Sequence, residues 1–276
     1  MEELSGKLEQ LRCFIRETGK DGVVIAFSGG VDSSTLAAVS SEVLGEKAVA
    51  VIAKSPTYTS EELEDARKVA KEIGIKLFII ETDELSNEDF SRNPENRCYY
   101  CKKELLKNLI DFAHELGFKA VFEGTNYSDL KEHRPGFQAV KEAKDVYSPW
   151  ILNKFAKGEI RQVAKEMGLS VNDKLALACL ASRIPFNERI TAEKLARIDK
   201  AEQAVKALTG VKQVRVRDHS GLARIEVGKT ERVAFCNVEV LDCVSECLKK
   251  LGFKYVTFDL EGYQSGSMLK TLDTTK

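Results

Sequence analysis

The chain has 276 residues, 31% of them charged, and a formal net charge of −1. This length is sufficient for one large domain and a smaller one, and a nearly neutral chain has no general attraction to nucleic acid, so we do not expect a nucleic-acid partner. No 18-residue apolar span is present, and residues 1–4 have neither a basic region nor an apolar signal core. These features argue against a membrane partner and predict a cytoplasmic protein.

The first part of the sequence alternates between helix and strand patterns. Residues 3–18 carry leucine and isoleucine at helical spacing, which predicts an amphipathic helix. Short apolar runs predict strands at 23–27, 47–53, 75–80 and from 120 onward, and helices are predicted to begin at 35 and to cover 60–73 and 102–117. Such alternation predicts an α/β fold with a doubly wound parallel sheet, whose ligands bind beyond the carboxyl ends of the strands.

The first predicted strand breaks into a Ser-Gly-Gly turn that leads into a helix. Glycine lets the backbone approach a bound group closely, and the N–H groups at the start of a helix attract anions. The turn therefore predicts a phosphate-binding loop, in which serine hydroxyls donate hydrogen bonds and Asp32 orients a hydroxyl or assists a metal ion. The candidate phosphate-binding residues are Ser28, Gly29, Gly30, Asp32, Ser33 and Ser34.

No lysine follows these glycines, so the loop differs from the Gly-x-x-x-x-Gly-Lys-Ser/Thr loop of kinases and GTPases. The Ser-Gly-Gly-Val-Asp-Ser-Ser sequence at 28–34 instead resembles the PP-loop of ATP pyrophosphatases, which include GMP synthetase, NAD synthetase and the tRNA thiolases. The resemblance implies a fold like that of the adenine nucleotide alpha hydrolases, with ATP and Mg²⁺ as cofactors. It also implies cleavage of ATP between the α and β phosphates, which gives AMP and pyrophosphate.

Two other strand ends are expected to share this crevice. Ala53 and Ser55, at the end of the second strand, are placed where adenine would lie against backbone groups. Gly124 and Thr125, at the end of the fourth strand, combine close backbone approach with a polar side chain. By itself the second loop would be ordinary turn chemistry. Because a phosphate-binding loop lies in the same crevice, we interpret both loops as ATP-binding.

The pattern changes after Pro185, so we place the domain boundary there, with domains at 1–185 and 186–276. The second domain is predicted to be small and α+β, with a mostly antiparallel sheet. Its helices are predicted at 191–208 and 236–251, and its strands at 213–217, 223–227 and 255–260. Edge strands and apolar helix faces lead us to expect a homo-oligomer.

Two arginines alternate along the first strand of this smaller domain. Side chains two residues apart lie on the same face of a strand, so Arg215 and Arg217 point to one side of the sheet. A pair of arginines is well suited to hold a substrate phosphate. From the residues alone, a solvated sheet face is an equally good explanation.

Seven cysteines, an odd number, indicate thiols or metal ligands more than a disulfide framework. Cys98 and Cys101 have the spacing of a redox pair, a zinc half-site or half of an iron–sulfur site. Cys179 is a third thiol, in a loop-like stretch that ends in proline. No second Cys-x-x-Cys and no nearby histidine supports a four-ligand zinc site, whereas three thiolates would suit a cubane cluster with one open iron. The remaining cysteines of the C-terminal helix, Cys236, Cys243 and Cys247, are interpreted as buried packing residues.

Four segments together resemble the LarE family of ATP-dependent sulfur transferases, and the resemblance covers nearly the whole chain. The segments are 97–102, 123–126, 179–185 and 261–267. Members of this family make the organic precursor of the nickel-pincer nucleotide cofactor of lactate racemase. The resemblance implies a small nucleotide substrate, pyridinium-3,5-biscarboxylic acid mononucleotide, which is adenylated and then receives sulfur to give a thiocarboxylate. Other enzymes of the same cofactor pathway are the implied partners.

The resemblance also implies roles for the cysteines. Cys179 matches the position at which some family members give up their own sulfur and leave dehydroalanine, but those members lack the complete Cys-x-x-Cys. With all three thiols present, this chain is more similar to the branch with a [4Fe-4S] cluster, here on Cys98, Cys101 and Cys179. The likeness also favours the phosphate clamp for the paired arginines. We expect Lys102 or Arg183 to stabilise the departing pyrophosphate, and Arg183 to activate the Cys179 thiol by its positive charge.

Three other functions compete with this interpretation. A tRNA thiolase would share the PP-loop and the three cysteines, but it should carry an RNA-binding surface or a zinc-ribbon domain, and a net charge of −1 argues against one. An amide-forming ATP-dependent ligase would use the PP-loop without needing Cys-x-x-Cys. A nucleotide-binding module without catalysis would bind ATP and release no pyrophosphate with any carboxylate.

Overall fold

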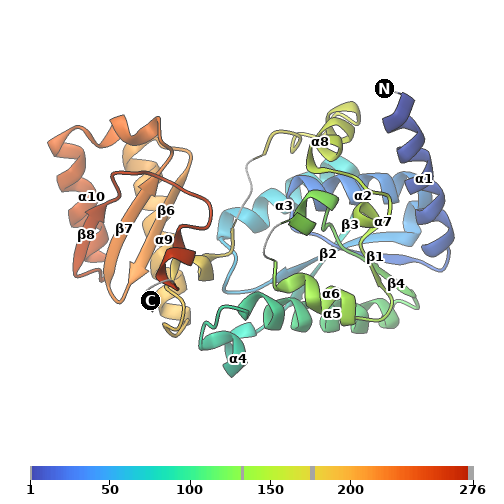
Figure 1. Cartoon of the computed structure of the whole chain (residues 1–276), viewed down its shortest axis with the longest axis horizontal. Helices are drawn as coiled ribbons and strands as arrows, with labels where there is room; N and C mark the ends of the chain where they lie inside the picture. Colours follow the sequence, from blue (N-terminus) through green and yellow to red (C-terminus); the bar gives the residue numbers. More distant parts are fainter. Residues whose placement is uncertain (1, 132–133, 175–177, 273–276) are drawn as a thin grey trace. The chain divides into compact units, whose positions relative to one another are not determined.

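The computed structural model describes residues 2–131, 134–174 and 178–272 (Figure 1). The chain divides into two compact units. The first unit contains Met1–Glu84 and Asn96–Leu177, and the second contains Leu85–Glu95 and Ala178–Lys276. In these described ranges, no helix is both long and apolar enough to cross a membrane.

The first unit is built on a five-stranded parallel sheet with helices on both faces (Figure 1). The strands have the spatial order β3-β2-β1-β4-β5, with bounds β1 Val23–Ala26, β2 Ala48–Lys54, β3 Lys76–Glu81, β4 Ala120–Phe122 and β5 Val146–Tyr147. The helices are α1 Glu2–Thr18, α2 Val31–Leu44, α3 Ser60–Ile73, α5 Arg97–Glu115, α6 Gly136–Glu142, α7 Pro149–Leu152 and α8 Lys157–Glu166. This arrangement confirms the predicted doubly wound α/β fold. The two-residue strand β5 has no apolar run that could have predicted it.

Alternate residues of the strands enter two separate apolar layers. Val23 and Ile25 of β1 belong to the cluster that contains residues of α1, α2, α3 and α8, whereas Val24 belongs to the cluster with α5. The interior strand β2 is buried over its first six residues, as expected for a parallel strand covered on both sides. The sheet is therefore anchored from both faces, and the carboxyl ends of β1, β2 and β4 lie at one edge.

Two helices begin earlier than the apolar pattern predicts. Helix α2 starts at Val31, so Asp32, Ser33 and Ser34 belong to its first turns. Helix α5 starts at Arg97, with no side-chain cap from the preceding asparagine. An uncapped polar first turn has no clear start signal in a sequence. As a result, the Cys-x-x-Cys motif lies within the first turns of α5 and not before the helix.

The second unit contains a three-stranded mixed sheet with the order β6-β7-β8. Its elements are α4 Glu88–Ser91, α9 Ala192–Thr209, β6 Val214–His219, β7 Leu222–Val227, α10 Val238–Lys250 and β8 Tyr255–Phe258. Strands β6 and β7 are antiparallel, but β8 runs parallel to β7. The prediction of a mostly antiparallel sheet is therefore wrong for β8, because α10 forms the crossover that a parallel pair requires.

The two faces of this small sheet differ in character. Val214 and Val216 of β6 enter an apolar cluster with residues of α9 and α10. The residues that alternate with them along the strand, Arg215 and Arg217, lie on the opposite face, as their spacing predicts. The paired strand β7 adds polar residues to that face, since Arg215 stands opposite Glu226 in the antiparallel register.

Residues 85–95 belong to the second unit although they fall within the span of the first. The buried side chain of Asn93 donates hydrogen bonds to the carbonyl oxygens of Ile184 (3.2 Å) and Pro185 (2.7 Å). The backbone N–H of Ile190 also donates to the carbonyl of Ser91 at 2.8 Å. These bonds fasten the early segment to the chain that follows residue 178.

Candidate nucleotide-binding site

The turn after β1 is held by hydrogen bonds among its own residues. The Ser28 N–H donates to the Ser33 hydroxyl at 3.2 Å, and the two serine hydroxyls lie 3.1 Å apart. Gly29 has a φ of +68°, and a Cβ at this position would lie only 2.9 Å from the Cα of Ala66 in α3. Both the backbone conformation and the close approach therefore require glycine. The turn is fixed at the start of α2, where N–H groups are available to an anion.

The end of β4 approaches this turn equally closely. A Cβ on Gly124 would lie 3.1 Å from the backbone nitrogen of Ser33 and 3.4 Å from the carbonyl carbon of Asp32. A glycine here lets the loop after β4 lie directly against the first turn of α2. The two strand ends thus form adjoining walls of one pocket.

This pocket lies where the carboxyl ends of β1, β2 and β4 meet. Most of the predicted ATP-binding residues line it, namely Ser28, Gly30, Asp32, Ser33, Ala53, Lys102, Gly124 and Thr125. The structure adds side chains that the sequence did not single out: Tyr58, Leu105, Glu123, Asp129 and Arg134. The position of the pocket is the one expected for ligands of a doubly wound sheet.

Four other predicted residues do not line the pocket. Gly29 packs under it against α3, and Ser34 is fully buried in α2, where its hydroxyl has no hydrogen-bond partner in the part of the chain that the structure describes. The Ser55 hydroxyl donates to the buried carboxylate of Glu84 at 2.6 Å. Arg183 belongs to the second unit.

Each carboxylate that lines the pocket has a cationic partner. The ion pairs are Asp32–Lys157, Glu123–Lys102 at 3.0 Å and Asp129–Arg134 at 2.8 Å. The partners come from α2, α5, α8 and the loops after β4, so residues far apart in the sequence balance each other's charge. The polar pocket is therefore nearly neutral in side-chain charge.

Glu123 is 1% exposed and is the most buried of these carboxylates. It accepts hydrogen bonds from the hydroxyls of Thr125 (2.6 Å) and Ser148, and from the ammonium group of Lys102. Burial alone would raise the pKa of Glu123, but the charge of Lys102 and these hydrogen bonds outweigh burial and hold the pKa below its ordinary value. The network ties α5 to the end of β4 behind the pocket.

Only one of the two carboxylate oxygens of Asp32 has a hydrogen-bond partner among the described residues. Its Oδ2 contacts the ammonium group of Lys157, whereas Oδ1 is buried and has no hydrogen-bond partner among the described residues. Burial raises the pKa of Asp32, and the opposite charge of Lys157 only partly offsets that rise. An unused carboxylate oxygen beside a phosphate-binding turn fits a hard cation such as Mg²⁺, which binds one or two carboxylates together with nucleotide phosphates.

The three cysteines proposed for a cluster belong to different units. Cys98 is exposed and Cys101 is half-buried in the first turns of α5, and exposed Cys179 precedes a 3₁₀ turn, Leu180–Arg183, in the second unit. Within residues 2–131, 134–174 and 178–272, no group of three or more histidine, cysteine or acidic side chains is placed to hold a metal ion. The thiols are chemically suited to iron.

The cysteines near α10 only partly follow the packing interpretation. Cys247 packs against the apolar cluster of the second unit. Cys236 and Cys243 are exposed, so their interpretation as buried residues is wrong. Cys236 precedes α10, and Cys243 is exposed because α10 buries only one stripe, centred on Val244 and Leu248.

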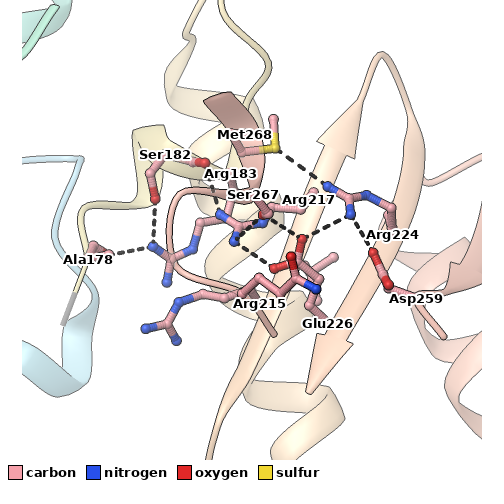
Figure 2. Close-up of polar contacts among 12 residues, drawn as sticks. Ala178, Ser182, Arg183, Arg215, Arg217, Arg224, Glu226, Asp259, Ser267 and Met268 are labelled. Carbon is pink, nitrogen blue, oxygen red and sulfur yellow. Dashed lines mark hydrogen bonds and ion pairs between the residues drawn. The ribbon is translucent and has the colours of Figure 1, made fainter. Parts of the chain in front are cut away.

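In the second unit, two of the predicted arginines are neutralised by buried carboxylates, and Figure 2 shows the pair of Arg217 with Glu226. Arg183, 2% exposed, makes a two-pronged ion pair with Glu202 at 2.9 and 3.0 Å. It also donates to the backbone carbonyl of Cys179 at 3.0 Å. Arg217 contacts Glu226 at 2.6 Å. Both guanidinium groups are held in place by bidentate or charge-assisted hydrogen bonds.

Arg215 differs from these neighbours. It is 8% exposed, donates to the carbonyl of Val214 at 2.7 Å and lies over the ring of Tyr263 at 5.4 Å, but it forms no ion pair with any described carboxylate. Figure 2 shows Arg217 and Arg224 converging on Glu226, whereas Arg215 extends to the side. Burial lowers the pKa of Arg215, and the nearby positive charge of Arg183 lowers it further. A bound anion would stabilise the charged guanidinium and so oppose both causes of the lowered pKa.

Comparison with known proteins defines the class of the chain. The sequence model described as NAD synthase matches residues 4–120. Together with the parallel sheet and the pocket beside the Ser-Gly-Gly turn, this match shows that the first unit has a PP-loop α/β fold and that the chain is an ATP-using enzyme.

Relatives that span nearly the whole chain define the family more narrowly. An uncharacterized protein of Synechocystis is 45% identical over 98% of this chain and 99% of its own length, and one of Methanocaldococcus jannaschii is 33% identical over 94% and 98%. The pyridinium-3,5-bisthiocarboxylic acid mononucleotide synthase of Lactiplantibacillus plantarum is 36% identical over 91% of this chain and 90% of that enzyme. The chain belongs to the family of this synthase, the LarE family, which confirms the resemblance seen in the sequence.

Proposed function

We propose that the chain is an ATP-dependent sulfur transferase that acts on pyridinium-3,5-biscarboxylic acid mononucleotide and makes a thiocarboxylate for the nickel-pincer nucleotide cofactor. The observation that carries this proposal is the 36% identity to the Lactiplantibacillus plantarum synthase over 91% of the chain. The pocket supports it, because its turn, its glycines and its ion pairs suit a nucleotide polyphosphate.

In the first step, a substrate carboxylate oxygen attacks the α-phosphorus of ATP. The bond from this phosphorus to the bridging oxygen breaks, and pyrophosphate leaves with the electron pair. The N–H groups of the turn and the first turn of α2 stabilise the charge on the phosphates, and Lys102 at the pocket wall is suited to the departing pyrophosphate. Asp32 would hold a Mg²⁺ ion, which would offset negative charge on the phosphates.

In the second step, a sulfur nucleophile attacks the carbonyl carbon of the acyl-adenylate, and AMP leaves with the electron pair of the broken C–O bond. Two sulfur sources are compatible with the thiols of this chain. A [4Fe-4S] cluster on Cys98, Cys101 and Cys179, when bound, would supply an iron-bound sulfide. Otherwise the Cys179 thiolate attacks, and elimination of its Cα proton then cleaves the Cβ–S bond and leaves dehydroalanine.

The arginine face of the second unit is suited to the substrate phosphate. Arg215 is buried without a carboxylate partner among the described residues, so a phosphate would supply the missing negative charge. Arg217 is already paired with Glu226, so we assign it to fixing the sheet face beside the phosphate. The predicted homo-oligomer stays part of this proposal, with β8 as an open sheet edge.

The deciding experiment measures iron, acid-labile sulfide and the visible spectrum of the full chain purified without oxygen. We expect about four irons per chain, lost in Cys98→Ala and retained in Cys243→Ala, which removes an exposed cysteine outside the proposed set. AMP and pyrophosphate should form with the carboxylate substrate. No iron, with loss of the Cys179 sulfur after one turnover, would support the sacrificial route. No AMP with this substrate would overturn the proposal.

A further inference from the structure

Lys157 is the first residue of α8, and its backbone is firmly held. Its N–H donates to the Ser128 hydroxyl at 3.1 Å, and the preceding Ala156 N–H is capped by the Glu159 carboxylate at 2.8 Å. Its side chain is 36% exposed and ends on Asp32 Oδ2. The start of α8 is thus anchored, while the four-carbon stem of the lysine can turn without moving the helix.

The backbone of Asp32 is also held in place. The indole N–H of Trp150 donates to the Asp32 backbone carbonyl at 3.1 Å. Trp150 is fully buried, so this contact stays fixed when a ligand binds. Oδ2 contacts Lys157, and Oδ1 is buried without a partner among the residues described. At the wall of the nucleotide pocket, the carboxylate therefore has one oxygen bound to a cation and one oxygen without a partner among the described residues.

The charge balance of the pocket determines what can bind there. With every lining carboxylate paired, a divalent ion that enters alone meets the positive charge of Lys157 next to Asp32, and no added negative charge offsets the repulsion. A polyphosphate changes the situation, because its oxygens offer Lys157 a new partner and offer the metal further ligands. Metal and lysine then no longer compete for the same carboxylate.

We propose that Lys157 takes the place of the metal on Asp32 until nucleotide binds, so that divalent-metal binding depends on ATP. Lys157 is then a positioning residue that holds the Asp32 carboxylate at the pocket wall, and that turns to the phosphates when the metal arrives. This inference rests on the proposed ATP site. It adds an order of assembly, in which the nucleotide precedes or accompanies the metal.

The test is Mn²⁺ binding to the full chain without nucleotide, followed by electron paramagnetic resonance. We expect wild type to bind Mn²⁺ weakly and Lys157→Met to bind it at least about tenfold more tightly, because the competing charge is removed. Lys165→Met makes the same change at an exposed position of the same helix and should match wild type. Adding Asp32→Asn to Lys157→Met should abolish the gain.

Measuring ATP binding on the same samples separates this inference from the proposed function. Wild type that does not bind ATP would overturn the nucleotide site itself. Wild type that binds ATP, together with a Lys157→Met variant that gains no Mn²⁺ affinity, would overturn the role of Lys157 alone. Equally tight Mn²⁺ binding by wild type and Lys157→Met would also overturn the role of Lys157. If Lys157→Met does not fold by circular dichroism, Lys157→Gln removes the same charge and is judged by the same outcomes.

Discussion

The nucleotide pocket of the first unit and the arginine face of the second unit differ in how completely their buried charges are paired. In the pocket, each lining carboxylate has its own cation. On the arginine face, Arg183 and Arg217 have carboxylate partners, and Arg215 has only a carbonyl and an aromatic ring. A balanced site suits a ligand that brings its own counterion, such as Mg²⁺ with ATP. A site with surplus positive charge suits a bare anion, such as the phosphate of a mononucleotide.

The largest effect should come from removing a partner of a buried pair. Arg183→Leu leaves the Glu202 carboxylate, 5% exposed, with the Val216 N–H at 3.0 Å as its one donor among the described residues. Loss of one member of a buried ion pair costs about 3–5 kcal/mol. We expect the free energy of unfolding to fall by this amount in urea denaturation. A change below about 1 kcal/mol would show that the buried Glu202 carboxylate does not depend on Arg183.

The same replacement at Arg215 should behave differently. Arg215→Leu removes a buried charge that no described carboxylate balances, so we expect no loss of unfolding free energy. The affinity for the mononucleotide substrate should weaken by about 1.5–3 kcal/mol, the contribution of a charged hydrogen bond. Calorimetric titration with the substrate checks this. Destabilisation as large as that of Arg183→Leu, with unchanged affinity, would make Arg215 a structural residue and would remove the contrast between the two regions.

A steric change separates the shape of the pocket from its charge balance. Gly29→Ala places a Cβ at a φ of +68° and 2.9 Å from the Ala66 backbone, so we expect a loss of about 1–3 kcal/mol in unfolding free energy. Gly30→Ala is the matched control, because its Cβ would meet only the Ser28 hydroxyl at 3.5 Å and its φ is −87°. Equal destabilisation by both variants would contradict the assigned role of Gly29.

The smallest effect is a pH dependence within the pocket. The pKa of Glu123 is below its ordinary value in the folded chain, so ionised Glu123 contributes stability above an ordinary glutamate pKa of about 4.3. That contribution disappears as the pH falls through the lower folded pKa. On acidification from about pH 5, stability should fall less steeply in Glu123→Gln than in wild type or in Glu46→Gln, which changes an exposed glutamate. Parallel curves for all three proteins would count against this reading of Glu123.

The sequence predicts the parts of the site that depend on neighbouring residues. The strand, the glycine turn and the loop at Gly124 can be read locally, because apolar runs and glycines act over a few positions. The Asp32–Lys157 pair joins residues 125 positions apart, so no local pattern indicates it. Arg183 looks like a candidate anion ligand in the sequence, and only the fold shows that Glu202 neutralises it. Likewise, the parallel pairing of β8 depends on the path of α10.

The course of the chain through the two units has a consequence for its synthesis. Residues 85–95 leave the ribosome long before Ile184 and Pro185, whose carbonyls bind the Asn93 side chain. The sheet of the first unit also cannot be completed until β4 and β5 are synthesised, and both follow residues 85–95 in the chain. Neither unit can therefore fold completely before the second half of the chain emerges, and Asn93 is synthesised well before Ile184 and Pro185. A gene fragment that begins at residue 178 would encode the second unit without this segment.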